Sequence, residues 1–203
     1  PNIGGSVSAK IVQFRETPDE QVEQPAPVRL NLGCNQRPIE GCINVDIHPF
    51  EGVDVVADLE KRWPWEDGSV DIVQCADLPE HIRMWWEVPD ASKFDGTVAG
   101  VEAALANPIR TYGIIHFMNE AHRVLKMGGI LDMLIPSTDA RGWAQDPTHV
   151  SYWNENSILY FTDKTYYGLY PHLITARFKP IKVATTVKNP LDISWVHAVL
   201  EKV

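Results

Sequence analysis

The sequence predicts an α/β fold built on a mostly parallel sheet, and two observations carry this prediction. Residues 28–32 form a short apolar run that stops at a turn containing Gly33, and a second run, 43–46, ends in the carboxylate of Asp46. Short apolar runs bounded by turn residues are typical of parallel strands covered on both faces. A ligand of such a sheet binds at the carboxyl ends of the strands. Gly33 and Asp46 are therefore predicted to lie beside a bound ligand.

The spacing of these residues indicates which ligand suits the turn. A dinucleotide-binding fold uses G-x-G-x-x-G, which lets the backbone approach a pyrophosphate, and places an acidic residue about 20 residues further on. Here no further glycine follows Gly33 in the turn, and Asp46 comes only 46 − 33 = 13 residues later. The turn therefore favours a ligand with an adenosine-type ribose and no phosphate, because one carboxylate can bind both ribose hydroxyls.

The connection between the first two strands is unusually short. Only ten residues, 33–42, separate them, whereas a parallel crossover usually needs a dozen or more. We therefore expect the first helix to be reduced to a turn or a coil bent at Pro38 and Gly41. This compaction should leave one face of the sheet thinly covered.

The second half of the chain predicts a helix followed by three strands. Apolar residues recur at three- and four-residue intervals over 111–126, which predicts a helix with Lys126 in its last turn and Gly128-Gly129 as its stop. Residues 130–135 then form a buried strand. The pattern over 173–203 fits two strands joined by a turn at Asn189-Pro190.

These segments, taken in order, resemble the class I S-adenosylmethionine-dependent methyltransferases. The runs Leu30-Asn31-Leu32-Gly33-Cys34 and Asn44-Val45-Asp46 are similar to the first motif and second strand of the small type 11-like group. Residues 53–59, 69–81 and 120–129 are similar to the third strand, to the fourth strand with the start of its helix, and to the helix and turn before the fifth strand. The resemblance implies a Rossmann-like, mostly parallel seven-stranded sheet with a C-terminal antiparallel pair.

The resemblance also implies S-adenosyl-L-methionine as the cofactor. It assigns Asp46 to the ribose, Gly33 and Cys34 to the turn around the amino-acid end, and Asp58 with Leu59 to the adenine. The full set of expected cofactor residues is Asn31, Gly33, Cys34, Asn35, Asp46, Ile47, Asp58, Leu59 and Asp77. Asn35 stands where the family usually has glycine, and Asp77 where it often has histidine. As a structural alternative, the two acids Asp46 and Asp58 would simply cap strand ends.

The implied activity is methyl transfer to a small-molecule or glycan acceptor, directed to oxygen. Two alternatives stay open: a non-catalytic module that binds S-adenosylmethionine, and an NAD-dependent enzyme, which the missing glycines disfavour. The sequence does not identify the acceptor or the oligomeric state.

Residues 139–150 follow the fifth strand and are rich in functional side chains. An acceptor would meet the methyl group at this end of the sheet. We predict His149 as the general base, oriented by Asp146 three residues earlier. The alternative is a turn with a side-chain cap, which Asp146-Pro147-Thr148-His149 would also form.

Asp77, Glu80 and His81 form a second cluster, spaced for one face of a helix start. A helix cap and a carboxylate lining the methyl-donor pocket are both reasonable interpretations. A metal site would need further ligands from elsewhere in the chain. The sequence therefore predicts no metal.

Residues 83–110 are longer than a helix connection needs. We interpret this segment as an inserted lid or substrate-side element, with a passive surface elaboration as the alternative. Residues 1–27 are predicted to be a partly ordered leader, and 28–203 a single methyltransferase domain.

The composition limits the possible partners. The net charge of −9 disfavours nucleic acid and anionic membranes, which attract positive surfaces. Three cysteines without C-x-x-C spacing indicate neither a zinc knuckle nor a disulfide framework. No segment is long and apolar enough for a membrane helix. We therefore expect a soluble cytoplasmic protein.

Overall fold

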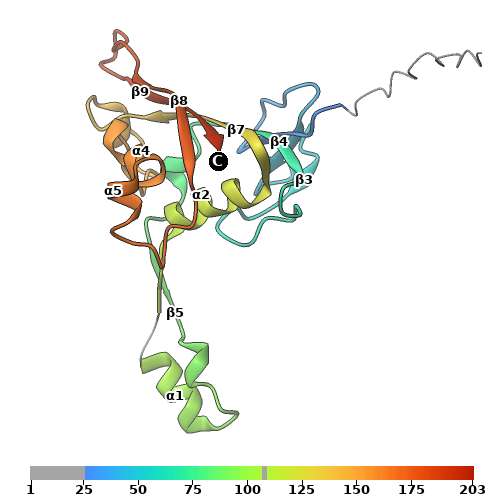
Figure 1. The fold of residues 1–203 in the computed structure, drawn as a ribbon, viewed down its shortest axis with the longest axis vertical. Helices are drawn as coiled ribbons and strands as arrows, with labels where there is room; N and C mark the ends of the chain where they lie inside the picture. Colours follow the sequence, from blue (N-terminus) through green and yellow to red (C-terminus); the bar gives the residue numbers. More distant parts are fainter. Residues whose placement is uncertain (1–25, 107–108) are drawn as a thin grey trace, which may run out of the picture.

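The computed structural model describes residues 26–106 and 109–203, which form a seven-stranded sheet with helices and a projecting arm (Figure 1). The strand order across the sheet is β3-β2-β1-β4-β7-β9-β8. The strands are β1 (Arg29–Leu32), β2 (Ile43–Asp46), β3 (Val55–Val56), β4 (Val70–Ala76), β7 (Leu125–Pro136), β8 (Phe178–Thr185) and β9 (Trp195–Lys202).

The sheet is parallel from β3 to β7 and antiparallel at its other end. β1 pairs in parallel with β2 and with β4, and β4 pairs in parallel with β7. β9 runs antiparallel to both β7 and β8. The predicted fold class, including the C-terminal antiparallel pair, is confirmed. The parallel register brings the carboxyl ends of β1, β2 and β4 to one edge of the sheet, where a ligand would bind.

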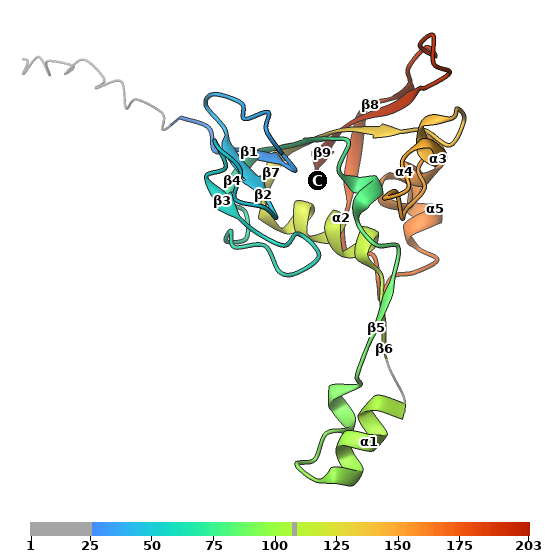
Figure 2. The ribbon, with the colours of Figure 1, turned by 180° about the vertical axis from the view of Figure 1, so that it is seen from behind.

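Four α-helices pack beside the sheet body. They are α2 (Gly113–Val124), α3 (Gly142–Gln145), α4 (Glu155–Thr162) and α5 (Lys164–Tyr167), and a 3-10 turn, η1 (Pro79–His81), follows β4. The longest, α2, lies along one face of the sheet (Figure 2) and buries Phe117, Met118, Ala121 and Val124 completely. Its apolar stripe supplies the core because residues three and four apart share a helix face.

The two faces of the sheet are covered unequally. Leu131, Met133 and Ile135 of β7 are fully buried on the face toward α2, whereas Asp132 and Leu134 between them stay partly exposed. Residues 33–42 contain no helix. The expected loss of the first helix and the thin cover on one face are both confirmed.

The predicted end of the helix was wrong. α2 ends at Val124, and β7 begins at Leu125 instead of at residue 130. Lys126 therefore lies in a strand, where its ammonium binds the Asp71 carboxylate at 2.8 Å. The strand is irregular here, since the β4 register shifts between Val70 and Ile72. The extra residues around Gly128 are accommodated as a bulge, which helical periodicity does not reveal.

Residues 86–106 and 109–111 form an arm that projects from the body (Figures 1 and 2). It consists of the antiparallel pair β5 (Trp86–Val88) and β6 (Ile109–Thr111), the 3-10 turn η2 (Ala91–Lys93) and α1 (Val98–Ala106). The arm covers nearly the whole predicted insertion 83–110. It is not folded over the body, so its role as a lid stays a prediction. The predicted leader lies outside the described residues, except for its last two positions.

Two further observations concern the chain as a whole. All three cysteines are free thiols. Among the described residues, no helix is long and apolar enough to cross a membrane.

Candidate functional site

A cavity of about 460 Å³ lies at the carboxyl ends of β1 and β2, which we call the strand-tip cavity. The loop after β3 and the segment after η1 complete its walls. The residues that line it are Gly33, Asp46, Ile47, Ala57, Asp58, Leu59, Glu60, Leu78, His81, Ile82 and Arg83. The parallel sheet thus places a cavity where the sequence predicted a ligand.

The turn after β1 closes tightly against this cavity. Gly33 has φ +66°, and a Cβ at this position would come within 2.9 Å of Leu78 Cδ1. Asn35 adopts φ +48°, a conformation that asparagine tolerates better than most residues. Asn35 can therefore replace the glycine that the family usually has here. Burial and the nearby Asp46 charge raise the pKa of the Cys34 thiol, so it stays protonated.

Asp46 fixes this turn from the neighbouring strand. Its Oδ2 accepts a hydrogen bond from the Asn35 N–H at 2.9 Å, and its Oδ1 accepts one from the His48 N–H at 3.0 Å. The residue is 8% exposed and borders the cavity. Each oxygen has a second lone pair. The carboxylate is thus held in place and can still accept hydrogen bonds from a ligand.

Five of the nine predicted cofactor residues line the strand-tip cavity, and four do not. Those that line it are Gly33, Asp46, Ile47, Asp58 and Leu59. Asn31 lies outside, because its amide donates to Asn44 Oδ1 at 2.9 Å and borders a separate hollow on the thinly covered face of the sheet. Alternation along β1 explains this placement, since successive side chains point to opposite faces.

Cys34, Asn35 and Asp77 make structural contacts near the cavity without lining it. Asp77 has φ +51° and its Oδ1 accepts a hydrogen bond from Trp195 Nε1 at 2.9 Å. This contact connects the end of β4 to the start of β9. Their direct contact with a cofactor stays a prediction.

Sequence reasoning missed the far wall of the cavity. Arg83 donates from its backbone N–H to Glu60 Oε1 at 2.8 Å and from its Nε to Oε2 at 2.7 Å. This ion pair joins the loop after β3 to the segment after η1. Both residues lie in loops 23 positions apart, and no local pattern relates them.

The predicted base lies against the 3-10 turn η1. Glu80 O accepts hydrogen bonds from Val150 N at 2.8 Å and Ser151 N at 3.0 Å, which fixes the loop that carries His149. His149 Nδ1 lies 3.1 Å from Trp143 O, and Nε2 lies 3.8 Å from Glu80 Oε1. The His81 and His149 rings meet edge to face, with centroids 4.8 Å apart. Both predicted clusters therefore come together in space.

Glu80 is a buried carboxyl group in this cluster. It is 1% exposed, and neither side-chain oxygen has a hydrogen-bond partner. Burial, with a smaller contribution from the charges of Asp77 and Asp146, raises the pKa of Glu80 to about 8. Burial has this effect because a low dielectric disfavours the charged form.

Asp146 does not orient His149 through its side chain. Its Oδ1 accepts hydrogen bonds from Thr148 N at 2.8 Å and from Thr148 Oγ at 2.6 Å. The side-chain hydrogen bond from Thr148 lowers the pKa of Asp146. The geometry is the side-chain-capped turn that the sequence offered as the alternative. The carbonyl of Trp143 contacts His149 Nδ1 instead, and the carboxyl of Glu80 lies opposite Nε2.

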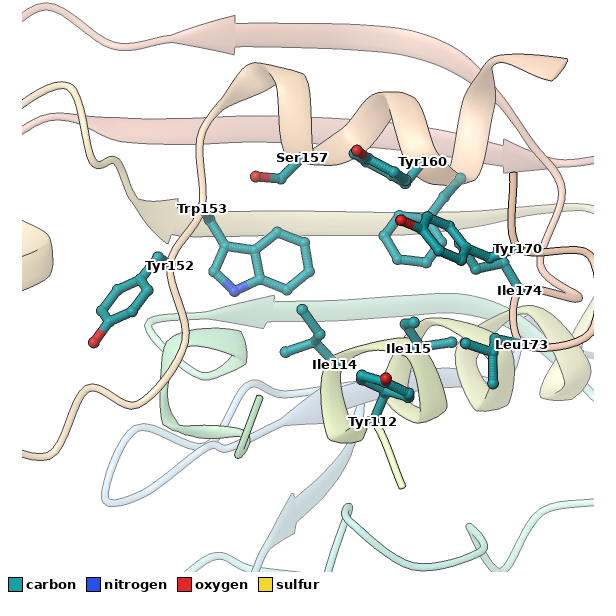
Figure 3. A pocket seen from close by; sticks show the side chains of 11 residues that line it. Tyr112, Ile114, Ile115, Tyr152, Trp153, Ser157, Tyr160, Tyr170, Leu173 and Ile174 are labelled. Atoms are coloured by element: carbon teal, nitrogen blue, oxygen red, sulfur yellow. The ribbon is translucent and has the colours of Figure 1, made fainter. Parts of the chain in front are cut away.

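A second cavity, of about 350 Å³, lies between α2 and α4, and Figure 3 shows its aromatic walls. We call it the aromatic cavity; the residues that line it are Tyr112, Ile114, Ile115, Tyr152, Trp153, Ser157, Tyr160, Phe161, Tyr170, Leu173 and Ile174. A hydrogen-bond chain connects it to η1, because Trp153 Nε1 donates to Ser151 Oγ at 3.0 Å and Ser151 Oγ donates to Pro79 O at 2.8 Å. Because His81 of η1 lines the strand-tip cavity, this hydrogen-bond chain links one wall of each cavity.

No protein-family model and no curated protein matches this sequence. Solved structures of several methyltransferases do match the fold. The Burkholderia thailandensis 1,6-didemethyltoxoflavin-N1-methyltransferase, solved with S-adenosylhomocysteine and 1,6-didemethyltoxoflavin, aligns with a TM-score of 0.53 at 11% identity, over 87% of this chain and 71% of that one.

Two archaeal structures align about as well over most of their own length. A SAM-dependent methyltransferase from Methanosarcina mazei gives a TM-score of 0.52 at 13% identity, over 89% of this chain and 94% of that one. A SAM-dependent methyltransferase from Archaeoglobus fulgidus gives 0.51 at 13% identity, over 88% and 87% of the two chains. The chain therefore has the Rossmann-like fold of the class I S-adenosylmethionine-dependent methyltransferases.

Proposed function

We propose that this chain is an S-adenosylmethionine-dependent methyltransferase that methylates an oxygen atom of a small-molecule or glycan acceptor. The observation that carries the proposal is the position of Asp46. Its fixed, buried carboxylate borders a cavity at the strand tips, and the neighbouring turn after β1 lacks the glycines that a pyrophosphate needs. A protein of the same fold holds S-adenosylhomocysteine, which supports the same cofactor here.

The aromatic cavity supports a small or ring-shaped acceptor. Its walls combine apolar side chains with the polar atoms of Tyr160, Tyr170 and Ser157 (Figure 3). Aromatic walls with polar tips suit stacking on a sugar or another ring. The net charge of −9 disfavours nucleic acid as the acceptor.

The reaction needs alignment more than activation of the donor. The acceptor oxygen attacks the methyl carbon, the new C–O bond forms, and the S–C bond breaks with its electron pair on sulfur, leaving S-adenosylhomocysteine. Holding the two reactants in line can supply several kcal/mol. The acceptor also loses its hydroxyl proton. His149 packs against His81, which lines the strand-tip cavity, and is the proposed residue for this step.

A two-stage experiment tests the proposal. Calorimetry with S-adenosylmethionine, S-adenosylhomocysteine and NAD should give binding heats for the first two and none for NAD. Transfer of a labelled methyl group to a panel of phenols, sugars and hydroxylated metabolites then identifies the acceptor.

The outcomes separate the alternatives. Binding of NAD alone would refute the cofactor assignment. Binding of S-adenosylmethionine without turnover on any acceptor would favour the non-catalytic module.

A further inference from the structure

The residues Glu80, His81 and His149 meet at η1, and His81 also lines the strand-tip cavity. Each offers one metal-ligating atom, and these three atoms lie within 4.8 Å of one another. His149 follows the other two in the chain only after the arm, α2, β7 and α3, yet the hydrogen bonds of Val150 and Ser151 to Glu80 O hold it here. The sequence argued against a metal because converging ligands were missing, and the fold supplies His149 as that ligand.

The buried Glu80 carboxyl group lacks the hydrogen-bond partners that buried polar groups normally have. Its side chain is 2% exposed, and both oxygens are without a hydrogen bond. Burying an unpaired carboxylate is costly, so buried carboxylates are normally paired, hydrogen-bonded or bound to a metal. A cation or a proton must therefore accompany this group.

A neutral His149 ring cannot donate a proton to the Glu80 carboxylate. Its Nδ1 lies 3.1 Å from Trp143 O, and a carbonyl oxygen can only accept. Nδ1 therefore carries the ring hydrogen, and the unprotonated Nε2 lies 3.8 Å from Glu80 Oε1. Two acceptor atoms thus face each other across a gap.

The His81 ring is held in the same way. Thr148 Oγ donates its hydrogen to Asp146 Oδ1 at 2.6 Å, so it accepts from His81 Nδ1 at 3.1 Å. The Nε2 atom of His81 is left with its lone pair. Metal-binding histidines characteristically donate the other ring N–H to a carbonyl or to a hydrogen-bonded polar group. Asp146 thereby gains a role as a positioning residue for His81.

We propose that Glu80, His81 and His149 bind a divalent first-row transition-metal ion. A tetrahedral site with bonds of about 2.1 Å separates its ligand atoms by about 3.4 Å. The present atoms, within 4.8 Å of one another, would need to approach by at most about 1.4 Å (4.8 − 3.4) to reach that separation. Two imidazoles and one carboxylate suit Zn²⁺, Fe²⁺ or Mn²⁺ better than Mg²⁺ or Ca²⁺, which prefer oxygen ligands. Three protein ligands leave a coordination position open, as in catalytic metal sites.

The role of the ion rests on the proposed function, although its binding does not. An acceptor hydroxyl at the open position would lose its proton more readily, because a bound metal lowers the pKa of an oxygen ligand. His149 would then act on the acceptor as a metal ligand instead of as a free base.

Metal titration of the untagged protein tests the site directly. After treatment with a chelator and dialysis, calorimetry with Zn²⁺ and Mn²⁺ and the visible spectrum of added Co²⁺ measure affinity, stoichiometry and coordination. The wild type should bind one ion per chain. Glu80→Gln and His149→Ala should each weaken binding by at least about 100-fold, the upper range for loss of a supporting residue. His172→Ala, which removes an exposed imidazole outside the cluster, should bind like the wild type.

The outcomes distinguish the possible failures. Equal affinities for wild type and Glu80→Gln, or no binding by the wild type, would overturn the metal site and leave a protonated Glu80. Thermal unfolding of the metal-free proteins shows whether Glu80→Gln is folded, since the neutral amide avoids the buried charge. Metal binding without any heat from S-adenosylmethionine would refute the proposed function and leave the metal site intact.

Discussion

The carboxylate of Asp46, at the end of β2, accepts a hydrogen bond from the backbone N–H of Asn35 at 2.9 Å. This contact joins the tips of two adjacent parallel strands. The same side chain borders the strand-tip cavity. A single residue thus shapes the turn and lines the cavity.

Replacing Asp46 should weaken cofactor binding strongly. Hydrogen bonds to a charged group contribute about 1.5–3 kcal/mol each, so Asp46→Ala should raise the Kd for S-adenosylmethionine at least about tenfold in calorimetry. Asp54→Ala is the matched control, because Asp54 bonds to Asn44 in the same region without lining the cavity. Equal losses in both variants would indicate a general disturbance of the strand tips instead of a lost ribose contact.

Substitutions at two glycines distinguish the cost of backbone strain from the cost of a steric clash. Gly33 and Gly41 both have positive φ, but only a Cβ at Gly33 would meet another atom, Leu78 Cδ1 at 2.9 Å. Gly41→Ala should therefore cost about 1–2 kcal/mol of unfolding free energy, the cost of a left-handed residue. Gly33→Ala should cost more, and Leu78→Ala in that background should recover part of the difference. Urea unfolding measures all three, and equal costs at the two glycines would contradict the clash.

The strand tips were predictable because their signals are local. The apolar runs, Gly33 and Asp46 lie within 19 residues of one another (28–46), and counting ten residues between strands was enough to exclude the first helix. The end of α2 was not predictable, since the bulge that places Lys126 in β7 depends on its pairing with β4.

Contacts between distant segments were also not predictable from the sequence. Glu60 with Arg83 and Glu80 with His149 meet only after the sheet has aligned its loops at one edge. The same limitation explains why the Asp146 side chain does not orient His149 as predicted. Its spacing from His149 suited an orienting contact, but the backbone N–H and the hydroxyl of Thr148 offered closer donors.

Substitutions of His149 and of Asp146 should differ in their effect on turnover. His149→Ala should keep the affinity for S-adenosylmethionine and lower kcat about 10²–10⁴-fold, the usual contribution of a proton-transfer residue. Asp146→Ala should have a smaller effect, because its carboxylate acts on His81 only through Thr148. Steady-state kinetics with the identified acceptor, together with calorimetry, check both. An unchanged kcat in His149→Ala would remove this residue from the mechanism.

The arm should be removable without loss of the fold. In its outer part Asp90 N donates to Ala104 O at 3.0 Å, and Val88 pairs with Ile109 at the end of β5 and β6. Replacing residues 89–108 with Asn-Gly, a favoured two-residue hairpin turn, should leave the Tm and the cofactor affinity unchanged. Differential scanning calorimetry and cofactor titration measure these. A large fall in Tm would show that the arm stabilises the body.

An ion pair next to the core should make stability depend on pH. Glu120 is 7% exposed and binds Arg123 through two hydrogen bonds of 2.7 Å, and its Oε2 also accepts from the Trp63 N–H at 2.7 Å. Burial alone would raise the pKa of Glu120, but the Arg123 and Trp63 hydrogen bonds and the Arg123 charge together lower it below its ordinary value of 4.5. A carboxyl group whose pKa is lowered by folding stabilises the protein above its unfolded pKa, and this contribution disappears as the pH falls through the folded pKa.

Glu120→Gln should therefore destabilise the protein at neutral pH and matter less in acid. At pH 7 the loss should reach about 3 kcal/mol, the low end for a broken buried ion pair, because Arg123 keeps its hydrogen bonds to Asp67 and to the carbonyls of Trp63 and Trp65. The difference between variant and wild type should hold down to about pH 5.5 and shrink below 4.5. Urea unfolding across this range measures it, with Glu66→Gln, an exposed site, as the control. A difference that stayed constant in acid would mean that the charge of Glu120 is not its source.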